Sequence, residues 1–115
     1  MTVDQAKREA ALDKKIIAMF RAQLDKELKA QAREMENAAK RHEDALKDYG
    51  SEADILDAYG YGFITERQYD RLAAAWRNAH EPKADRQDFI DYLKREIDFT
   101  QTTMREMQKI IEGVK

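Results

Sequence analysis

Hydrophobic and polar positions near the C-terminus follow a heptad pattern. The seam residues recur at alternating steps of three and four, with one polar member: Ile90, Leu93, Ile97, Thr100, Met104, Met107, Ile111 and Val114. This spacing predicts a long helix with one continuous seam, which has to pack on a partner helix. Tyr92 and Phe99 fall outside the seam, so we expect residues 90–100 to be apolar on two faces and to lie between two neighbours.

A second long helix is predicted over residues 3–48. Its apolar residues first recur in steps of four and then, from Leu28 to Tyr49, in alternating steps of four and three. Because only the alternating pattern keeps one seam, we expect residues 28–49 to pair antiparallel with residues 90–114. Residues 1–25 are then expected to form an extension or oligomerisation arm. Its surplus apolar stripe predicts a homodimer and consists of Leu12, Ile16, Ile17, Phe20 and Leu24.

Two short helices are expected between the long ones, because glycine and proline punctuate only this region and the last turn. Ser51 is positioned to cap a helix over 52–59, and Thr65 with Gln68 forms a capping box for a helix over 66–80. Asp85 is expected to cap the last helix, over 86–113. The predicted fold is all-α: a single domain over residues 1–115 that forms an elongated helical bundle.

Composition narrows the class of protein. The 21 basic and 23 acidic residues give a net charge of −2, and the lack of a basic stripe disfavours non-specific nucleic-acid binding. The chain has no cysteine, which excludes disulfides and thiolate metal sites. No apolar run approaches the roughly 18 residues of a spanning helix, so we expect neither a signal peptide nor membrane association. The expected location is the cytoplasm.

Residues suited to catalysis or metal binding are scarce. The only serine, Ser51, is better explained as a helix cap, and no glycine-rich phosphate loop is present. Neither His42 nor His80 has the glutamate three residues earlier that di-iron bundles use. The carboxylates of residues 81, 85, 88 and 91 are interpreted as complementing a helix N-terminus rather than binding a cation. We therefore expect no enzyme activity, cofactor or metal.

Six of the ten aromatic residues lie between positions 49 and 76: Tyr49, Tyr59, Tyr61, Phe63, Tyr69 and Trp76. Tyrosine and tryptophan dominate binding hot spots, which makes this segment a candidate recognition surface. The alternative is that bulky side chains hold the short helices together, and we favour it for Phe63, Tyr69 and Trp76. As partner-binding candidates we take the turn residues Tyr59, Tyr61 and Phe63 together with Ile16, Phe20 and Leu24 of the arm.

The segment 52–80 also resembles a helix-turn-helix in outline, with Arg67, Gln68 and Arg71 placed to read base edges. Its net acidic charge and its turn, longer than three or four residues, argue against DNA binding. The sequence therefore favours a non-enzymatic helical protein-interaction module, acting as a small inhibitor or adaptor of a larger macromolecular complex. A DNA-binding transcriptional regulator is the alternative. Imitation of DNA by the carboxylates ranks below a plain aromatic contact, because the charges nearly balance.

Overall fold

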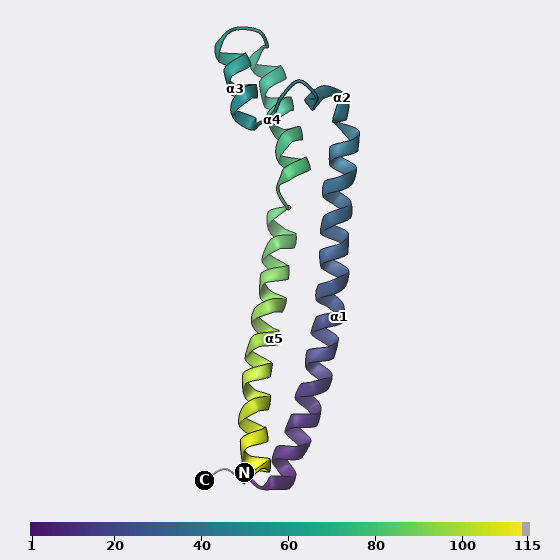
Figure 1. Ribbon diagram of the computed structural model, residues 1–115, viewed down its shortest axis with the longest axis vertical. Coiled ribbons are helices and arrows are strands. Elements are labelled where there is room, and N and C mark those ends of the chain that lie inside the picture. The colour runs from purple at the N-terminus through teal and green to yellow at the C-terminus, as the bar shows by residue number, and fades with distance from the viewer. Residues whose placement is uncertain (114–115) are drawn as a thin grey trace. The chain divides into compact units, whose positions relative to one another are not determined.

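The structure, a computed structural model, describes residues 1–113 and is all-α in this range, with 84% helix and no strand (Figure 1). The predicted helical bundle with long first and last helices is confirmed. Val114, the last member of the predicted seam, lies outside the described residues. The helices are α1 (Val3–Arg41), α2 (Glu43–Leu46), α3 (Glu52–Gly60), α4 (Glu66–His80) and α5 (Ala84–Ile111).

Local capping signals place the starts of three helices where the sequence predicts them. Before α1, the backbone N–H of Gln5 donates to Thr2 Oγ1 (3.1 Å) while the N–H of Thr2 donates to Gln5 Oε1 (2.9 Å). Ser51 Oγ accepts from the N–H of Asp54 at the start of α3. The cap expected from Asp85 is wrong, because α5 already begins at Ala84 and Asp85 lies inside its first turn.

The first helix does not continue to residue 48. Its backbone leaves helical dihedral values at His42 (φ −111°, ψ 10°), and the four-residue helix α2 follows. Leu46 on α2 is buried, and Tyr49 packs against the cluster of buried residues to which Leu46 belongs. Because of the interruption, these two residues of the predicted seam pack in another core. The chain forms two compact units: Met1–Leu28 with the described residues from Asp85 onward, and Lys29–Ala84.

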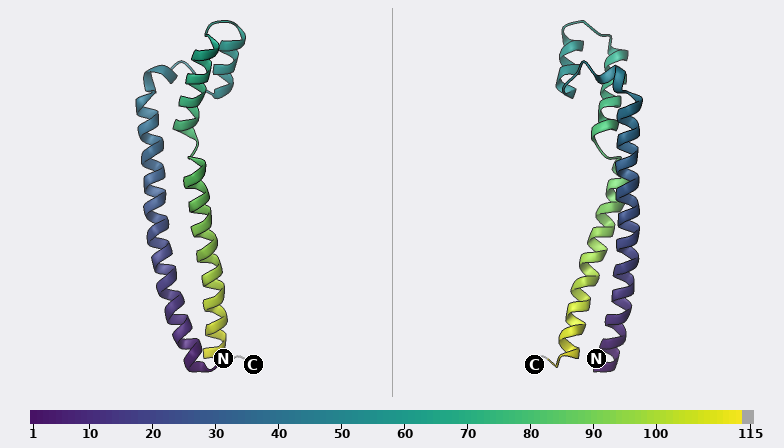
Figure 2. Two further views of the ribbon diagram at one scale, coloured as in Figure 1. Left: turned by 180° about the vertical axis from the view of Figure 1, so that it is seen from behind. Right: turned by 45° about the vertical axis from the view of Figure 1, so that its right-hand side comes forward.

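The first unit is an antiparallel hairpin made by the start of α1 and by α5 (Figures 1 and 2). The predicted seam of α5 is confirmed, because Ile90, Leu93, Ile97 and Thr100 are all buried. The Thr100 hydroxyl donates to the carbonyl of Glu96 (2.8 Å), which satisfies the one polar seam residue. At one end of the hairpin, Arg86 and Glu27 form an ion pair.

The predicted pairing of residues 28–49 with 90–114 is wrong, since residues 1–28 form the compact unit with α5. The prediction failed because it counted only apolar residues. The buried and half-buried positions at the start of α1 also alternate by four and three, but several of them hold small or polar residues, which such a count leaves out. This seam of α1 consists of Ala6, Ala10, Asp13, Ile17, Phe20, Leu24 and Glu27.

The second apolar face of α5 is not covered. Tyr92 is exposed, and Phe99 is 71% exposed, so the expectation that residues 90–100 lie between two neighbours is wrong. The physical reason is that the first unit supplies one partner helix for α5, and that helix covers the seam alone.

The second unit has a core formed by Leu46, Ile55 and Ala75. Helices α3 and α4 pack against each other beside it. Tyr69 and Trp76 pack against this cluster, as predicted, together with Tyr49, Ile64 and Leu72.

Candidate functional site

The last residues of α3 and the turn that follows carry three aromatic side chains, and this segment is called the aromatic turn below (Tyr59–Phe63). Tyr61 is 78% exposed and Phe63 is 81% exposed, and their ring centroids lie 6.3 Å apart. Tyr59 is less exposed, because its ring stacks on Tyr69 at 5.3 Å and so connects the turn to a residue beside the core. The structure thus brings together all three turn residues that the sequence singled out.

The expectation that Phe63 packs in the core is wrong, and the neighbouring residue shows the reason. Ile64 is half-buried against the cluster of Leu46, Ile55 and Ala75, whereas Phe63 remains exposed. The turn therefore directs Ile64 inward, and the residue before it is left in solvent.

Hydrogen bonds close the end of α3 in a Schellman motif. The N–H of Phe63 donates to the carbonyl of Ala58 (2.9 Å), and the N–H of Gly62 donates to the carbonyl of Tyr59 (3.0 Å). Gly62 has φ +79°, the left-handed conformation that this motif requires and that glycine adopts without a steric penalty. The backbone that presents Tyr61 and Phe63 is consequently held in one conformation at its α3 side.

The α4 side of the turn is closed by the predicted capping box. Gln68 Oε1 accepts from the N–H of Thr65 (2.8 Å), and Thr65 Oγ1 accepts from the N–H of Gln68 (3.2 Å). Only two residues lie between Gly62 and Thr65, so both ends of a short segment are hydrogen-bonded. Pre-ordering of this kind lowers the entropy lost when a surface binds a partner.

We predict that two glycine substitutions here have opposite effects on stability. Gly62→Ala should lower the free energy of unfolding by about 1 kcal/mol, because alanine is strained at φ +79°. Gly60→Ala should raise it by about 0.5–1 kcal/mol, because Gly60 ends α3 and an added Cβ meets nothing within 4 Å. Urea denaturation of both variants measures the difference, and a stabilising Gly62→Ala would contradict the assigned turn.

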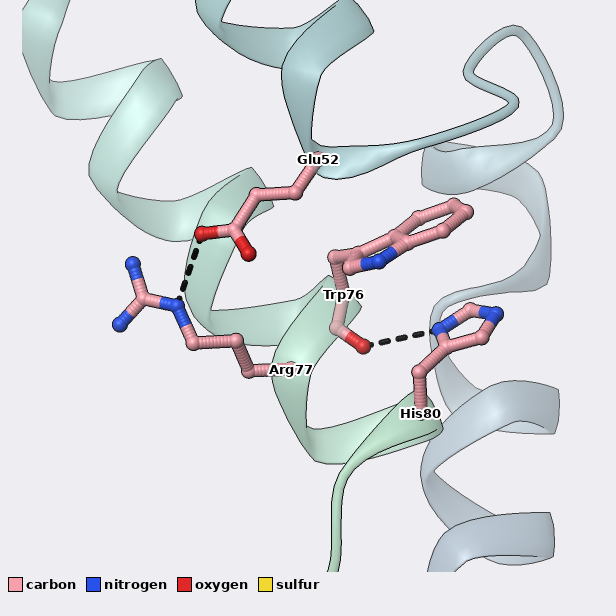
Figure 3. A network of polar contacts seen from close by, with 4 residues as sticks. All are labelled: Glu52, Trp76, Arg77 and His80. Atoms are coloured by element: carbon pink, nitrogen blue, oxygen red, sulfur yellow. Dashed lines mark hydrogen bonds and ion pairs between the residues drawn. The ribbon is translucent and has the colours of Figure 1, made fainter.

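Away from the turn, an ion pair connects α3 to α4, and an aromatic and a polar contact lie within α4 (Figure 3). Arg77 Nε donates to Glu52 Oε1 (2.9 Å), and this hydrogen bond raises the pKa of the guanidinium above its usual value. The His80 ring stacks on Trp76 with centroids 3.9 Å apart, and its Nδ1 donates to the Trp76 carbonyl (2.9 Å). These contacts are exposed, so they orient side chains more than they stabilise the fold.

The residues of the DNA-binding alternative lie in the first turns of α4. Arg67 and Arg71 are exposed and four residues apart, which places them on one face of the helix. Gln68 is also exposed, but its carbonyl oxygen accepts the capping hydrogen bond from Thr65. Bidentate recognition of adenine needs that oxygen as well as the amide N–H, so Gln68 is not arranged to read a base while it caps α4.

The predicted arm residues are placed differently from the turn residues. Phe20 and Leu24 are half-buried in the seam of α1, and Ile16 is half-buried beside it. Two large apolar side chains nearby, Leu12 and Met19, are more than half exposed, and sequence reasoning missed Met19. Its signal was the four-then-three spacing of residues 12, 16 and 19.

Sites for ions and small molecules are weakly developed in the described part of the chain. Among residues 1–113, no three His, Asp or Glu side chains come together to hold a metal ion. A hollow of about 190 Å³ in the second unit is lined by residues of α1 and by residues 78 and 81–83. Other hollows along the described residues measure about 300–440 Å³, within the range of about 300–1,000 Å³ usual for small-molecule sites, but they are open to solvent. None of the helices formed by residues 1–113 combines the length and the apolarity needed to cross a bilayer.

Searches with protein-family models, with curated protein sequences and with solved structures each returned no match to the chain.

Proposed function

We propose that the protein is a non-enzymatic protein-interaction module whose aromatic turn binds a partner protein. One observation carries this proposal: Tyr61 and Phe63 are about four-fifths exposed on a backbone that is hydrogen-bonded at both ends. Large aromatic side chains left in solvent are unfavourable unless something covers them. In this proposal the partner covers them, and the module acts as an inhibitor or adaptor of a larger complex.

The chemistry of the turn indicates what the partner offers. Two aromatic rings 6.3 Å apart fit a shallow apolar pocket, because buried aromatic anchors dominate the binding energy of such interfaces. Residues 50–79 carry five acidic and three basic side chains, so a basic rim around that pocket would complement them. The proposed partner is thus a protein with an apolar pocket and a basic border.

The test compares three full-length variants as baits in extract of the cells that make the protein. Tyr61→Ala and Phe63→Ala should each reduce capture of the partner about tenfold or more, as loss of a hot-spot residue does. Leu56→Ala is the matched control, because Leu56 is 51% exposed on α3 but lies outside the turn. Circular dichroism verifies that all three remain helical. If both turn variants capture the partner as well as the parent does, the binding surface lies elsewhere.

DNA binding by the segment 52–80 is the second proposal, and it ranks lower because Gln68 is engaged as a cap. The two functions differ in their response to salt. A DNA-binding regulator loses affinity for duplex DNA steeply as salt rises, whereas a protein-interaction module should retain no duplex even at low salt. A gel-shift series at two salt concentrations separates them.

A further inference from the structure

The uncovered face of α5 repeats with the heptad period. Its members alternate by three and four, as the buried seam does, but each precedes a seam position by one residue. Phe89 and Tyr92 stack with centroids 6.2 Å apart, and Phe99 is the most exposed apolar side chain of this face. The row consists of Phe89, Tyr92, Glu96, Phe99, Thr103, Glu106 and Ile110.

A matching row runs along the start of α1, and its members likewise precede the seam positions by one residue. Leu12 is 52% exposed and Met19 is 60% exposed, with the half-buried Ile16 between them. Gln23 and Lys26 continue the row toward the C-terminus, and Gln5 and Glu9 precede it. Both helices of the hairpin therefore carry a second stripe, with apolar residues at its middle in α1, at the same offset from their shared seam.

The two stripes lie on the same side of the hairpin. Two antiparallel helices are related by an approximate two-fold axis perpendicular to their common plane, so positions with the same offset from the seam share a side. The opposite side confirms this geometry, because residues that follow seam positions by one line a common hollow there. They are Lys14 and Arg21 of α1 and Gln101 and Gln108 of α5.

The resulting face is large enough to bind another protein surface. An aromatic side chain offers about 150–250 Å². At the observed exposures of Phe89, Tyr92 and Phe99, these three leave on the order of 300 Å² of aromatic surface in solvent. Leu12 and Met19 add to this area, and the largest apolar patch on a monomer, which is commonly of this size, is often functional.

We propose that this face, called the stripe face, binds the stripe face of a second copy of the chain and forms a four-helix bundle. The three-and-four spacing fits helices as the occupant, because it is the period of helix packing along a common seam. A face two helices wide is matched by another of the same width, as a two-fold symmetric dimer provides. This gives the predicted homodimer a surface that uses both helices, in place of an N-terminal arm.

Charge at the edges of the stripe face selects one of two dimer arrangements. The edge of α1 is the side of its stripe that lies farther from α5; it carries three basic residues, Arg8, Lys15 and Lys26, whereas the acidic Glu9 lies on the side nearer α5. The edge of α5 carries three acidic and two basic residues, namely Asp85, Asp88, Glu106, Arg95 and Lys109. A two-fold axis parallel to the helices places α1 of one copy on α5 of the other, so edges of opposite net charge meet. An axis perpendicular to the helices would stack α1 of one copy on α1 of the other, which brings two basic edges together.

Polar residues in the middle of the stripe face give this pairing a defined register. Gln23 and Glu96 are both half-buried at central positions of the two stripes. Polar groups at otherwise apolar helix interfaces lower affinity but discriminate against shifted pairings. The dimer is accordingly a moderate-affinity one that dissociates on dilution.

Sedimentation equilibrium of the full chain across the micromolar range tests the proposal. The parent should show twice its mass of 13.5 kDa at the upper concentrations. Leu12→Glu should weaken the dimer at least tenfold, whereas Leu56→Glu, the same change at 51% exposure instead of 52%, should leave it intact. Circular dichroism monitors folding of both variants. A parent of 13.5 kDa throughout, or equal association of the two variants, would overturn the proposal.

Cross-linking then distinguishes the two arrangements, because the chain has no natural cysteine. Ile17 and Met104 line the same hollow, and Glu27 pairs with Arg86, so in the antiparallel hairpin Lys15 lies near the level of Thr102, which is exposed. When chains with Lys15→Cys are mixed with chains carrying Thr102→Cys, a short bis-maleimide should join the two kinds of chain. A cross-link between two Lys15→Cys chains in its place would show α1 stacked on α1 and would refute the proposed axis.

Discussion

Replacing Ile55 by alanine is expected to lower the free energy of unfolding by about 2–5 kcal/mol. Ile55 has no exposed surface and lies in the core of the second unit with Leu46 and Ala75. The substitution removes buried methyl and methylene groups and leaves a cavity that the α3–α4 hairpin can close only in part. The loss should therefore exceed that of any other single truncation considered for this unit.

Leu56→Ala is the matched control, since Leu56 is the next residue of α3 and is 51% exposed. Its truncation should change the free energy of unfolding by less than about 1 kcal/mol. Trp76 packs against the same cluster and is the only tryptophan, so its fluorescence during urea denaturation monitors this unit directly. Equal losses for Ile55→Ala and Leu56→Ala would mean that the packing of α3 is misassigned.

Asp13→Leu is expected to raise the free energy of unfolding by about 1–3 kcal/mol. Asp13 is only 6% exposed in the seam of α1, and its Oδ2 has no hydrogen-bond partner among residues 1–113. Burying a polar group without a partner is unfavourable, and an apolar side chain at a seam position adds helix packing instead. The variant should stay helical and should melt at a higher temperature.

Two further variants show whether the gain arises from removing the buried carboxylate. Asp13→Asn keeps a buried polar side chain, so it should raise the free energy of unfolding less than Asp13→Leu does. Asp98→Leu changes an exposed aspartate on α5 and should fall within about 0.5 kcal/mol of the parent. Thermal melts followed by circular dichroism compare all three. If Asp13→Leu melts below the parent, the carboxylate makes a contact that the hairpin needs.

Much of the candidate site was readable in the sequence, because its signals are local. Thr65 and Gln68 are three residues apart, so this cap forms within one turn of chain. The glycines on either side of Tyr61 likewise predict a turn between two short helices. What the sequence could not decide was whether Phe63 or Ile64 enters the core, since that depends on how α3 packs on α4.

By itself, the sequence determined most of the helices, the caps at Ser51 and Thr65, and the seam of α5, because hydrogen bonds within a helix and heptad spacing depend on near neighbours. Only the tertiary structure decided which helix covers that seam. The start of α1 does so with a stripe that includes Ala6 and Asp13, residues that count as weakly apolar or polar in any single-residue reading. Small side chains pack closely against large ones across an interface, so the match between two surfaces, rather than the hydrophobicity of either, selected the pair.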